Sequence, residues 1–307
     1  MRVIITGGSG LIGRELTKRL SAAGDEIVIL SRNPDHVTGL PANAQAVAWD
    51  AHTAEGWGHL IDSSTAIINL AGASIGDGRW TDERKRRIIE SRINATTAVV
   101  QAVQTAPNKP ATVIQASAVG YYGNRGDEIL TETSAPGQDY FLSDVCAQWE
   151  NASQPLAQEP DVRLVIIRTG VVLTTKDGAL PKMLIPFKLF AGGPFGDGQQ
   201  WFPWIHIQDE VSAIEFLLKN PQTDGVYNLS APEIMTNKQF AKTLGKVLNR
   251  PSFIPAPAPA LKLALGEMSA LVLDGQRAVS DKLQASGFTF AYPQAAPALQ
   301  DIIDNDR

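Results

Sequence analysis

The chain has 307 residues, of which 44% are hydrophobic and 19% charged, with a formal net charge of −5. These are the values of a globular protein long enough to bury a large core, and the acidic balance disfavours a general nucleic-acid-binding role. The single cysteine, Cys146, rules out an internal disulfide and is typical of a reducing compartment.

The first half of the chain alternates short apolar runs with segments of helical spacing. The runs are rich in Val and Ile and lack polar alternation, which is typical of strands buried on both faces. They occur at Arg2–Ile5, Glu26–Leu30, Ala46–Trp49, Ala66–Leu70, Thr112–Ala116 and Arg163–Ile167. Between them, apolar stripes predict a helix after the first run and longer helices over about 81–105 and 139–158. This alternation predicts an α/β fold with a Rossmann-like, doubly wound parallel sheet.

The regular alternation of strand and helix patterns ends at about residue 170. Residues 192–204 are rich in Gly and aromatic residues and predict a loop, and residues 255–259 (PAPAP) predict a stiff linker or turn. The tail over 260–307 is mostly helical in pattern. We therefore expect a sheet domain over 1–170, with sheet elements returning at about 203–230. A smaller, mostly helical C-terminal lobe would comprise 171–202 and 231–307.

A glycine-rich turn follows the first predicted strand and opens the first predicted helix. Glycines at 8, 10 and 13 satisfy the G-x-G-x-x-G pattern, and Gly7 adds a second spacing. Glycine permits the tight turn and lets the backbone approach a pyrophosphate, which the free N–H groups of the helix N-terminus attract. The motif predicts a dinucleotide site, with cofactor contacts from Gly7, Gly10, Leu11, Ile12 and Gly13. A glycine-rich turn without a ligand is the alternative.

The end of the second strand bears on the choice of dinucleotide. A site that prefers NAD carries an acid there to bond the ribose 2′-hydroxyl. This chain has Ser31-Arg32 instead, and a guanidinium suits a 2′-phosphate. NADP(H) is therefore favoured over NAD(H), although Arg32 could be a plain surface arginine. Asp50, after the third strand, is expected near the adenine edge, and a solvated acid is equally compatible with its position.

These residues resemble the extended short-chain dehydrogenase/reductase superfamily. TGGSGLIG is similar to its cofactor turn, Asn69-Leu70-Ala71-Gly72 to its fourth-strand motif, and Ser117 to its catalytic serine. The resemblance is greatest to an atypical, nucleoside-diphosphate-sugar epimerase-like subgroup with a C-terminal domain of unknown function. The matching pieces are Arg79-Trp80, Ser91-Arg92, Cys146 with Trp149-Glu150, Gly192-Gly193-Pro194, Trp204-Ile205-His206, Gly266-Glu267-Met268, Gly275-Gln276-Arg277 and Gly287-Phe288. The resemblance implies cofactor contacts from Leu70, Ala71, Gly72 and Ser117.

The superfamily's catalytic Tyr-x-x-x-Lys pair is missing. None of the five tyrosines has a lysine four residues later, so the pair in which a lysine ammonium depresses the tyrosine pKa is absent. By the resemblance, Cys146 stands at the lysine position, and Arg92 replaces an asparagine that opens the long helix. Arg92 could supply charge near the cofactor, and Tyr121 could face it. Cys146 could act as an acid/base if Arg92 lowered its pKa, but its helical stripe equally suits plain packing.

Two functions stay open. The first is an NADP-dependent oxidoreductase or epimerase acting on a nucleotide sugar or a small carbonyl compound. Ser117, Tyr121 and Cys146 are the catalytic candidates, and the substrate contacts would be Lys182, Trp201 and Trp204. The second is a non-catalytic NADP-binding sensor or regulator, which the lost Tyr-Lys pair favours.

The remaining expectations concern the setting of the protein. No signal-peptide pattern and no apolar window long enough to span a membrane are seen, which predicts a cytoplasmic protein without a membrane or nucleic-acid partner. The protein would be a monomer or a homodimer formed through the two long helices. The four histidines and one cysteine show no metal-ligand spacing.

Overall fold

A computed structural model of the protein describes residues 1–138 and 140–305. Its centre is a seven-stranded, all-parallel sheet in the order β10-β7-β5-β4-β1-β2-β3. The strands are β1 (Arg2–Thr6), β2 (Glu26–Ser31), β3 (Ala44–Ala48), β4 (Thr65–Asn69), β5 (Thr112–Ala118), β7 (Arg163–Thr169) and β10 (Gly225–Leu229). The predicted doubly wound sheet is confirmed. The order reverses between β1 and β4, and such switch points are where open α/β sheets bind ligands.

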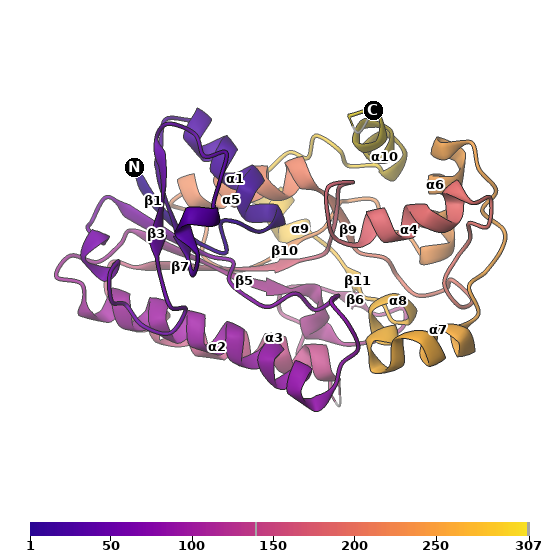
Figure 1. Ribbon diagram of the computed structural model, residues 1–307, viewed down its shortest axis with the longest axis horizontal. Coiled ribbons are helices and arrows are strands. Elements are labelled where there is room, and N and C mark those ends of the chain that lie inside the picture. Colours follow the sequence, from indigo (N-terminus) through magenta and orange to yellow (C-terminus); the bar gives the residue numbers. More distant parts are fainter. Residues whose placement is uncertain (139, 306–307) are drawn as a thin grey trace.

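Helices cover both faces of the sheet (Figure 1). Helices α1 (Leu11–Ala22) and α5 (Ile207–Lys219) pack on one face, and α2 (Asp82–Thr105) and α3 (Phe141–Ser153) lie together on the other. A hydrophobic core lies on each face of the sheet, and successive strand residues point into alternate cores. Val3 and Ile5 pack with α1 and α5, while Ile4 packs with α2. The strands therefore need apolar side chains on both faces, which explains their unbroken Val/Ile runs.

The predicted helix over 139–158 is shorter in the structure. Its first residue, Asp139, lies outside the described residues. The α-helix ends at Ser153, and a 3₁₀ turn continues from Gln154 to Gln158 because Pro155 cannot extend the i→i−4 bonding.

The other lobe is formed by parts of the second half of the chain that do not join the main sheet, whereas β7, α5 and β10 belong to the sheet domain. Two small parallel pairs join distant segments: β8 (Val171–Leu173) with β9 (Trp204–His206), and β6 (Ile129–Leu130) with β11 (Arg277–Ala278). Of the sheet elements expected at 203–230, only β10 joins the main sheet. The helices of this lobe are α4 (Ala179–Lys188), α6 (Asn237–Leu248), α7 (Ala258–Leu265), α8 (Ala270–Leu273), α9 (Asp281–Ala285) and α10 (Ala295–Asp304). The predicted helical character of the C-terminal region is confirmed.

Within residues 1–138 and 140–305, no helix is both long enough and apolar enough to cross a bilayer.

Candidate dinucleotide site

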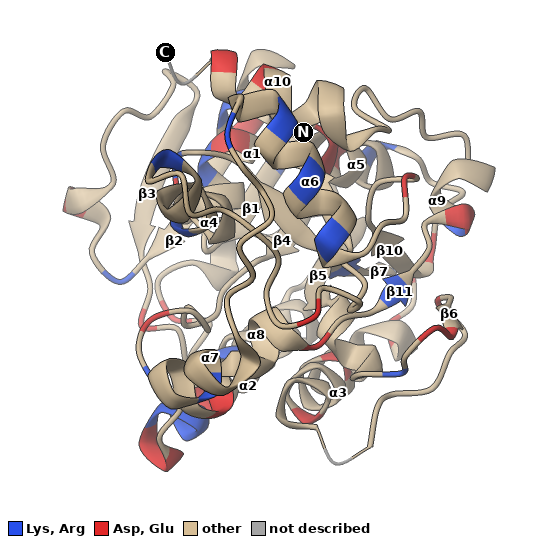
Figure 2. Cartoon of the chain, turned by 90° about the vertical axis from the view of Figure 1, so that its right-hand side faces the viewer, with Lys and Arg blue, Asp and Glu red and all other residues tan. Residues whose placement is uncertain are grey.

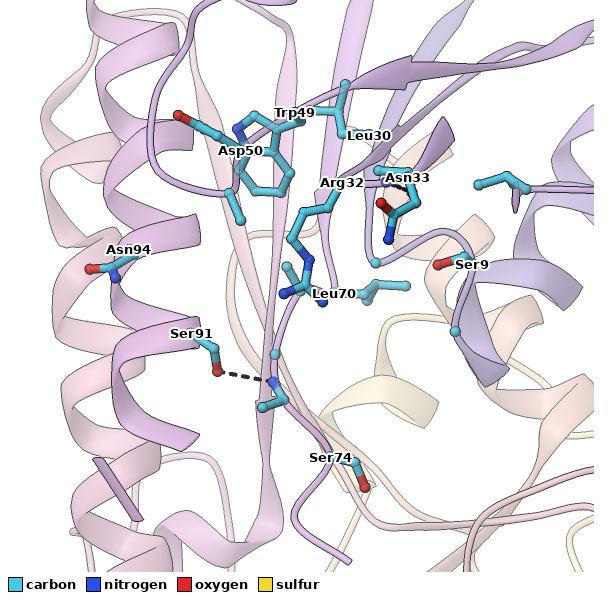
Figure 3. Close-up of a pocket in the computed structure, with 18 of the residues that line it drawn as sticks. Ser9, Leu30, Arg32, Asn33, Trp49, Asp50, Leu70, Ser74, Ser91 and Asn94 are labelled. Carbon is cyan, nitrogen blue, oxygen red and sulfur yellow. Dashed lines mark hydrogen bonds between the residues drawn. The ribbon is translucent and has the colours of Figure 1, made fainter. Parts of the chain in front are cut away.

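A cavity of about 650 Å³ opens at the carboxyl edge of strands β1 to β4. It lies between the glycine turn, the ends of β2 and β3, the segment after β4, and one face of α2 (Figure 3). Eight of the predicted cofactor residues line it: Gly7, Gly10, Ser31, Arg32, Asp50, Leu70, Ala71 and Gly72. The cavity is thus assembled at the topological switch point.

The glycine turn is built by close backbone packing. Gly7 adopts a φ of 68°, and a Cβ there would lie 2.7 Å from the carbonyl oxygen of Leu70. A Cβ at Gly13 would clash with the Gly7 carbonyl oxygen and would lie 2.6 Å from the Cα of Gly8. The Gly7 carbonyl accepts a hydrogen bond from the Gly10 N–H at 3.0 Å. Gly13 therefore lets α1 press against the turn and does not line the cavity.

A buried polar network holds the segment after β4 against β1. Thr6 Oγ1 donates to Asn69 Oδ1 at 2.5 Å, and the Asn69 amide donates to Gln115 Oε1 at 2.8 Å and to Thr96 Oγ1 at 3.0 Å. The backbone N–H of Ala71 donates to Thr6 Oγ1 at 3.2 Å. These bonds fix Leu70 and Ala71 beside the glycine turn, and the buried amide has partners for its polar atoms.

Arg32 follows β2 and reaches into the space between the glycine turn and α2 (Figure 3). Its guanidinium has no hydrogen-bond or ion-pair partner in the described part of the chain. Arg14, on α1, also lines the cavity, where its Nε donates to the Ser9 carbonyl at 2.7 Å. Arg14 is not among the residues predicted from the sequence, although its place one residue after the glycine motif is a usable signal.

Asp50 lines the cavity but uses its carboxylate locally. It accepts hydrogen bonds from the N–H groups of His52 and Thr53 at 2.8 Å and from the Thr53 hydroxyl at 2.9 Å. The bond from the His52 N–H is the largest of the effects that hold the pKa of Asp50 below its usual range. The carboxylate therefore stabilises the turn after β3 as well as facing the cavity.

One face of α2 forms the opposite wall. Arg84, Arg87, Ser91 and Asn94 recur at spacings of three and four and all line the cavity. The Ser91 hydroxyl accepts the Ala73 N–H at 2.9 Å, and Arg84 donates to the Ser74 carbonyl. Arg87 is exposed to solvent and also lines the cavity. The spacing of three and four residues places all four on one face of the helix, and this pattern in the sequence could have identified them.

Three further predicted cofactor residues lie outside the cavity. Leu11 and Ile12, the first two residues of α1, are half-buried and pack against the hydrophobic core between α1, α5 and the sheet. Arg92 lies behind the segment after β4, where its Nη1 donates to the Ala73 and Ile88 carbonyls at 3.0 Å. Its guanidinium carbon lies 4.8 Å from the Trp149 ring centroid, a cation–π contact. Arg92 thus supports the cavity wall from behind.

Ser117, at the end of β5, also lies outside the cavity, within a buried network. Its hydroxyl donates to Glu150 Oε1 at 2.6 Å. Arg168 on β7 grips the same carboxylate in a bidentate pair, with Nε and Nη2 each 2.8 Å from an oxygen. Arg168 also donates to the Tyr122 hydroxyl at 3.0 Å, and that hydroxyl donates to Asn228 Oδ1 at 2.6 Å. The Ser117 proton is therefore committed to the carboxylate, and toward a ligand its oxygen can act only as an acceptor.

Tyr121 lies in a 3₁₀ turn over Val119–Tyr122, and its ring stacks on Arg168. The guanidinium carbon of Arg168 lies 3.4 Å from the ring centroid. The Tyr121 hydroxyl has no hydrogen-bond partner among residues 1–138 and 140–305. It is the free proton-carrying group on this turn.

Cys146 is buried in α3, close to Ser117 and Gly120. Burial, aided by the Glu150 carboxylate, raises the pKa of its thiol to about 11, and Arg92 offsets this only in part. The sequence-based suggestion required a lowered pKa, so this placement argues against an acid/base role. The thiol remains protonated and packs as a small apolar group.

Of the three predicted substrate contacts, Trp201 and Trp204 line one small pocket of the second lobe, and Lys182 lies apart from them. Trp204 is a correction: it is 1% exposed in the core of the second lobe, where its indole N–H donates to the Glu233 carbonyl at 3.2 Å. Trp201 is half-buried and donates to Asp127 Oδ1 at 2.9 Å. Lys182 is exposed, and its ammonium donates to the Gly76 carbonyl at 3.2 Å, near the cavity mouth. His206 caps α5 and stacks on Tyr292, which is a structural role.

Comparison with known proteins places this geometry in a family. The model of the NAD dependent epimerase/dehydratase family matches residues 3–230, and a domain of unknown function, DUF1731, matches residues 256–302. The epimerase family protein YfhF of Bacillus subtilis is 42% identical over 305 residues, covering 99% of this chain and 98% of that protein. The chloroplastic SDR39U1 homolog of Arabidopsis thaliana is 40% identical over 306 residues, covering 99% and 87%.

Solved structures agree. The crystal structure of the human epimerase family protein SDR39U1 (isoform 2) with NADPH matches with a TM-score of 0.89 at 33% identity, covering 99% of this chain and 100% of that one. UDP-N-acetylglucosamine 4-epimerase from Bacillus cereus, 14% identical with a TM-score of 0.77, shares the fold. The chain therefore belongs to the NAD-dependent epimerase/dehydratase family, with a C-terminal DUF1731 domain.

Proposed function

We propose that this protein binds NADP(H) in the cavity at the switch point. The observation that carries the proposal is the unpaired Arg32 guanidinium, in the same cavity as the glycine turn and in the place where an NAD site carries an acid. A relative at 33% identity was crystallised with NADPH, which supports the same assignment.

The residues present fit such a cofactor. The N-terminus of α1 suits a pyrophosphate, since the first N–H groups of a helix have no intrahelical partner and the glycines before it leave the backbone open to a ligand. Arginines outnumber acids in the lining: Arg14, Arg32, Arg84 and Arg87 against Asp50 and Asp77. This surplus suits a dinucleotide that carries an additional phosphate.

We further propose that the site serves an oxidoreductase or epimerase reaction on a nucleotide sugar or a small carbonyl compound. The bound cofactor supplies hydride transfer at its nicotinamide. Ser117 can only accept a hydrogen bond from a ligand, because its own proton is donated to the Glu150 carboxylate, which Arg168 holds. It therefore suits a substrate hydroxyl better than a carbonyl oxygen. Tyr121, with its free hydroxyl beside Arg168, is the proposed proton carrier.

A non-catalytic NADP(H) sensor is the second candidate. It is favoured by the protonated thiol at Cys146, where the resemblance implies a lysine, and by the engaged proton of Ser117. Neither group can perform the work of a Tyr-Lys pair.

Two measurements test these proposals. Arg32→Ala should weaken NADPH binding at least tenfold while leaving NADH binding almost unchanged, with Arg125→Ala as a control for an arginine outside the cavity. Equal losses for both cofactors would refute the 2′-phosphate assignment. For catalysis, single-turnover absorbance of bound NADPH should change with at least one nucleotide sugar or carbonyl compound, and Tyr121→Phe should abolish that change. Tight binding without any change across a broad panel would favour the sensor.

A further inference from the structure

The segment from Ile234 to Gly266 reverses the charge of the rest of the chain. Its 33 residues carry five cations and no aspartate or glutamate, in a protein with a net charge of −5. The cations are Lys238, Lys242, Lys246, Arg250 and Lys262. Such a local reversal marks a surface for an anionic partner.

Three of these lysines line one face of α6. Lys238, Lys242 and Lys246 are spaced four residues apart and are exposed, while the opposite face buries Phe240 and Leu244. None of the three lysines forms an ion pair in the described part of the chain. Figure 2 shows basic and no acidic residues on α6, which lies at the end of the molecule that faces the viewer.

Bulky apolar side chains are exposed beside these cations. Seven of the nine large exposed hydrophobic residues of the described chain fall between Ile185 and Leu263: Ile185, Leu189, Phe190, Ile234, Phe253, Ile254 and Leu263. Phe253 is 77% exposed, Leu189 72% and Leu263 80%. The end of α4 adjoins the segment after α6, because Arg250 stacks 4.4 Å from the Phe190 ring and Ile254 bonds to the Gly192 carbonyl.

Helix α7 extends this apolar surface. Its sequence, APALKLAL, contains one charge, yet none of its eight residues is buried. An apolar helix normally packs into a core, and one left on the surface indicates a partner. Helices α4, α6 and α7 lie at the same end of the molecule (Figures 1 and 2).

We propose that this end of the C-terminal lobe docks peripherally on an anionic lipid bilayer. Unpaired lysines attract the anionic headgroups, while projecting Phe and Leu side chains enter the boundary between headgroups and acyl chains. A second copy of the chain is disfavoured because a symmetric contact would place these lysines against one another. The proposal revises the sequence-based expectation of no membrane partner without requiring a spanning segment, and it is independent of the proposed cofactor chemistry.

The test is co-sedimentation of the full chain with vesicles of neutral phosphatidylcholine and with vesicles containing 30% phosphatidylglycerol. The wild type should partition at least tenfold more strongly onto the anionic vesicles, and 0.5 M NaCl should remove the difference. Each surface lysine contributes a factor of roughly five. Replacing Lys238, Lys242 and Lys246 with Gln should therefore weaken partitioning on the order of 100-fold.

Matched variants separate this surface from general charge and hydrophobicity. Replacing Lys18, Lys176 and Lys219 with Gln removes the same charge from ion-paired sites and should leave partitioning within about twofold, since paired sites contribute little. Phe253→Ser with Leu263→Ser should weaken partitioning at least tenfold, while Ile129→Ser should not. Circular dichroism melting verifies that every variant folds. Equal partitioning onto both vesicles, an α6 variant that binds like wild type, or a wild-type dimer lost in the α6 variant would each overturn the proposal.

Discussion

The buried pair of Glu150 and Arg168 should be the most sensitive ionic contact in the sheet domain. The Arg168 side chain is 3% exposed and the Glu150 side chain 8%. In Arg168→Met, the carboxylate would stay buried with only the Ser117 hydroxyl as partner, and the Tyr122 hydroxyl would lose a donor. Breaking a buried pair in this way costs about 3–5 kcal/mol of unfolding free energy. Urea unfolding followed by tryptophan fluorescence measures the loss.

Two variants control that measurement. Arg125→Met removes a partly exposed pair with Glu128 and should cost less than about 1 kcal/mol. Replacing both partners, as Glu150→Leu with Arg168→Met, should recover much of the single-variant loss because no buried charge is left unpaired. A cost below about 1 kcal/mol for Arg168→Met would refute the reasoning, since it would mean that water reaches the carboxylate.

Three further predictions rest on individual side chains. Gly13→Ala should lower thermal stability and abolish dinucleotide binding, because its Cβ would clash with the Gly7 carbonyl, whereas Gly76→Ala meets only the Lys182 ammonium at 3.7 Å and should be tolerated. Cys146, with its pKa raised to about 11, should react with a disulfide reagent at pH 8 roughly 100-fold more slowly than a free thiol, and a comparable rate would contradict its burial. Burial raises the pKa of Glu210 to about 8, so the folded state holds a proton that the unfolded state releases near pH 4.5. The stability of the folded state should therefore fall as the pH rises from about 5 to 8. In a series of Tm measurements against pH, Glu210→Gln should flatten that slope.

The sheet could be predicted from the sequence because its signals are local. Strands buried on both faces need unbroken apolar runs, and the glycine turn needs its residues at fixed spacing. The strand predicted over Arg2–Ile5, observed as Arg2–Thr6, and the glycine turn could therefore be identified directly. Arg32 was found for the same reason, since it directly follows a strand. The cavity-lining residues of α2 were not predicted in this way, because charged and polar residues on a helix equally suit a face exposed to solvent.

Contacts between distant segments could not be predicted in this way. Arg168 contacts Glu150 and Tyr122 only because β7 lies beside β5 and α3 packs across them. No local sequence pattern indicates these contacts. Trp204 was predicted as a substrate contact from its place at the end of the loop expected over 192–204. Because β8 pairs with β9, the Trp204 side chain is instead buried in the core of the second lobe.

The most direct test of the central claim compares two fragments of the cofactor. Adenosine 2′,5′-bisphosphate and adenosine 5′-monophosphate differ only in the 2′-phosphate. Titration calorimetry should show the bisphosphate binding at least tenfold more tightly, and Arg32→Ala should reduce that difference to less than about threefold. Equal affinities in the wild-type protein, or a preference that survives Arg32→Ala, would contradict the assignment of this cavity to NADP(H).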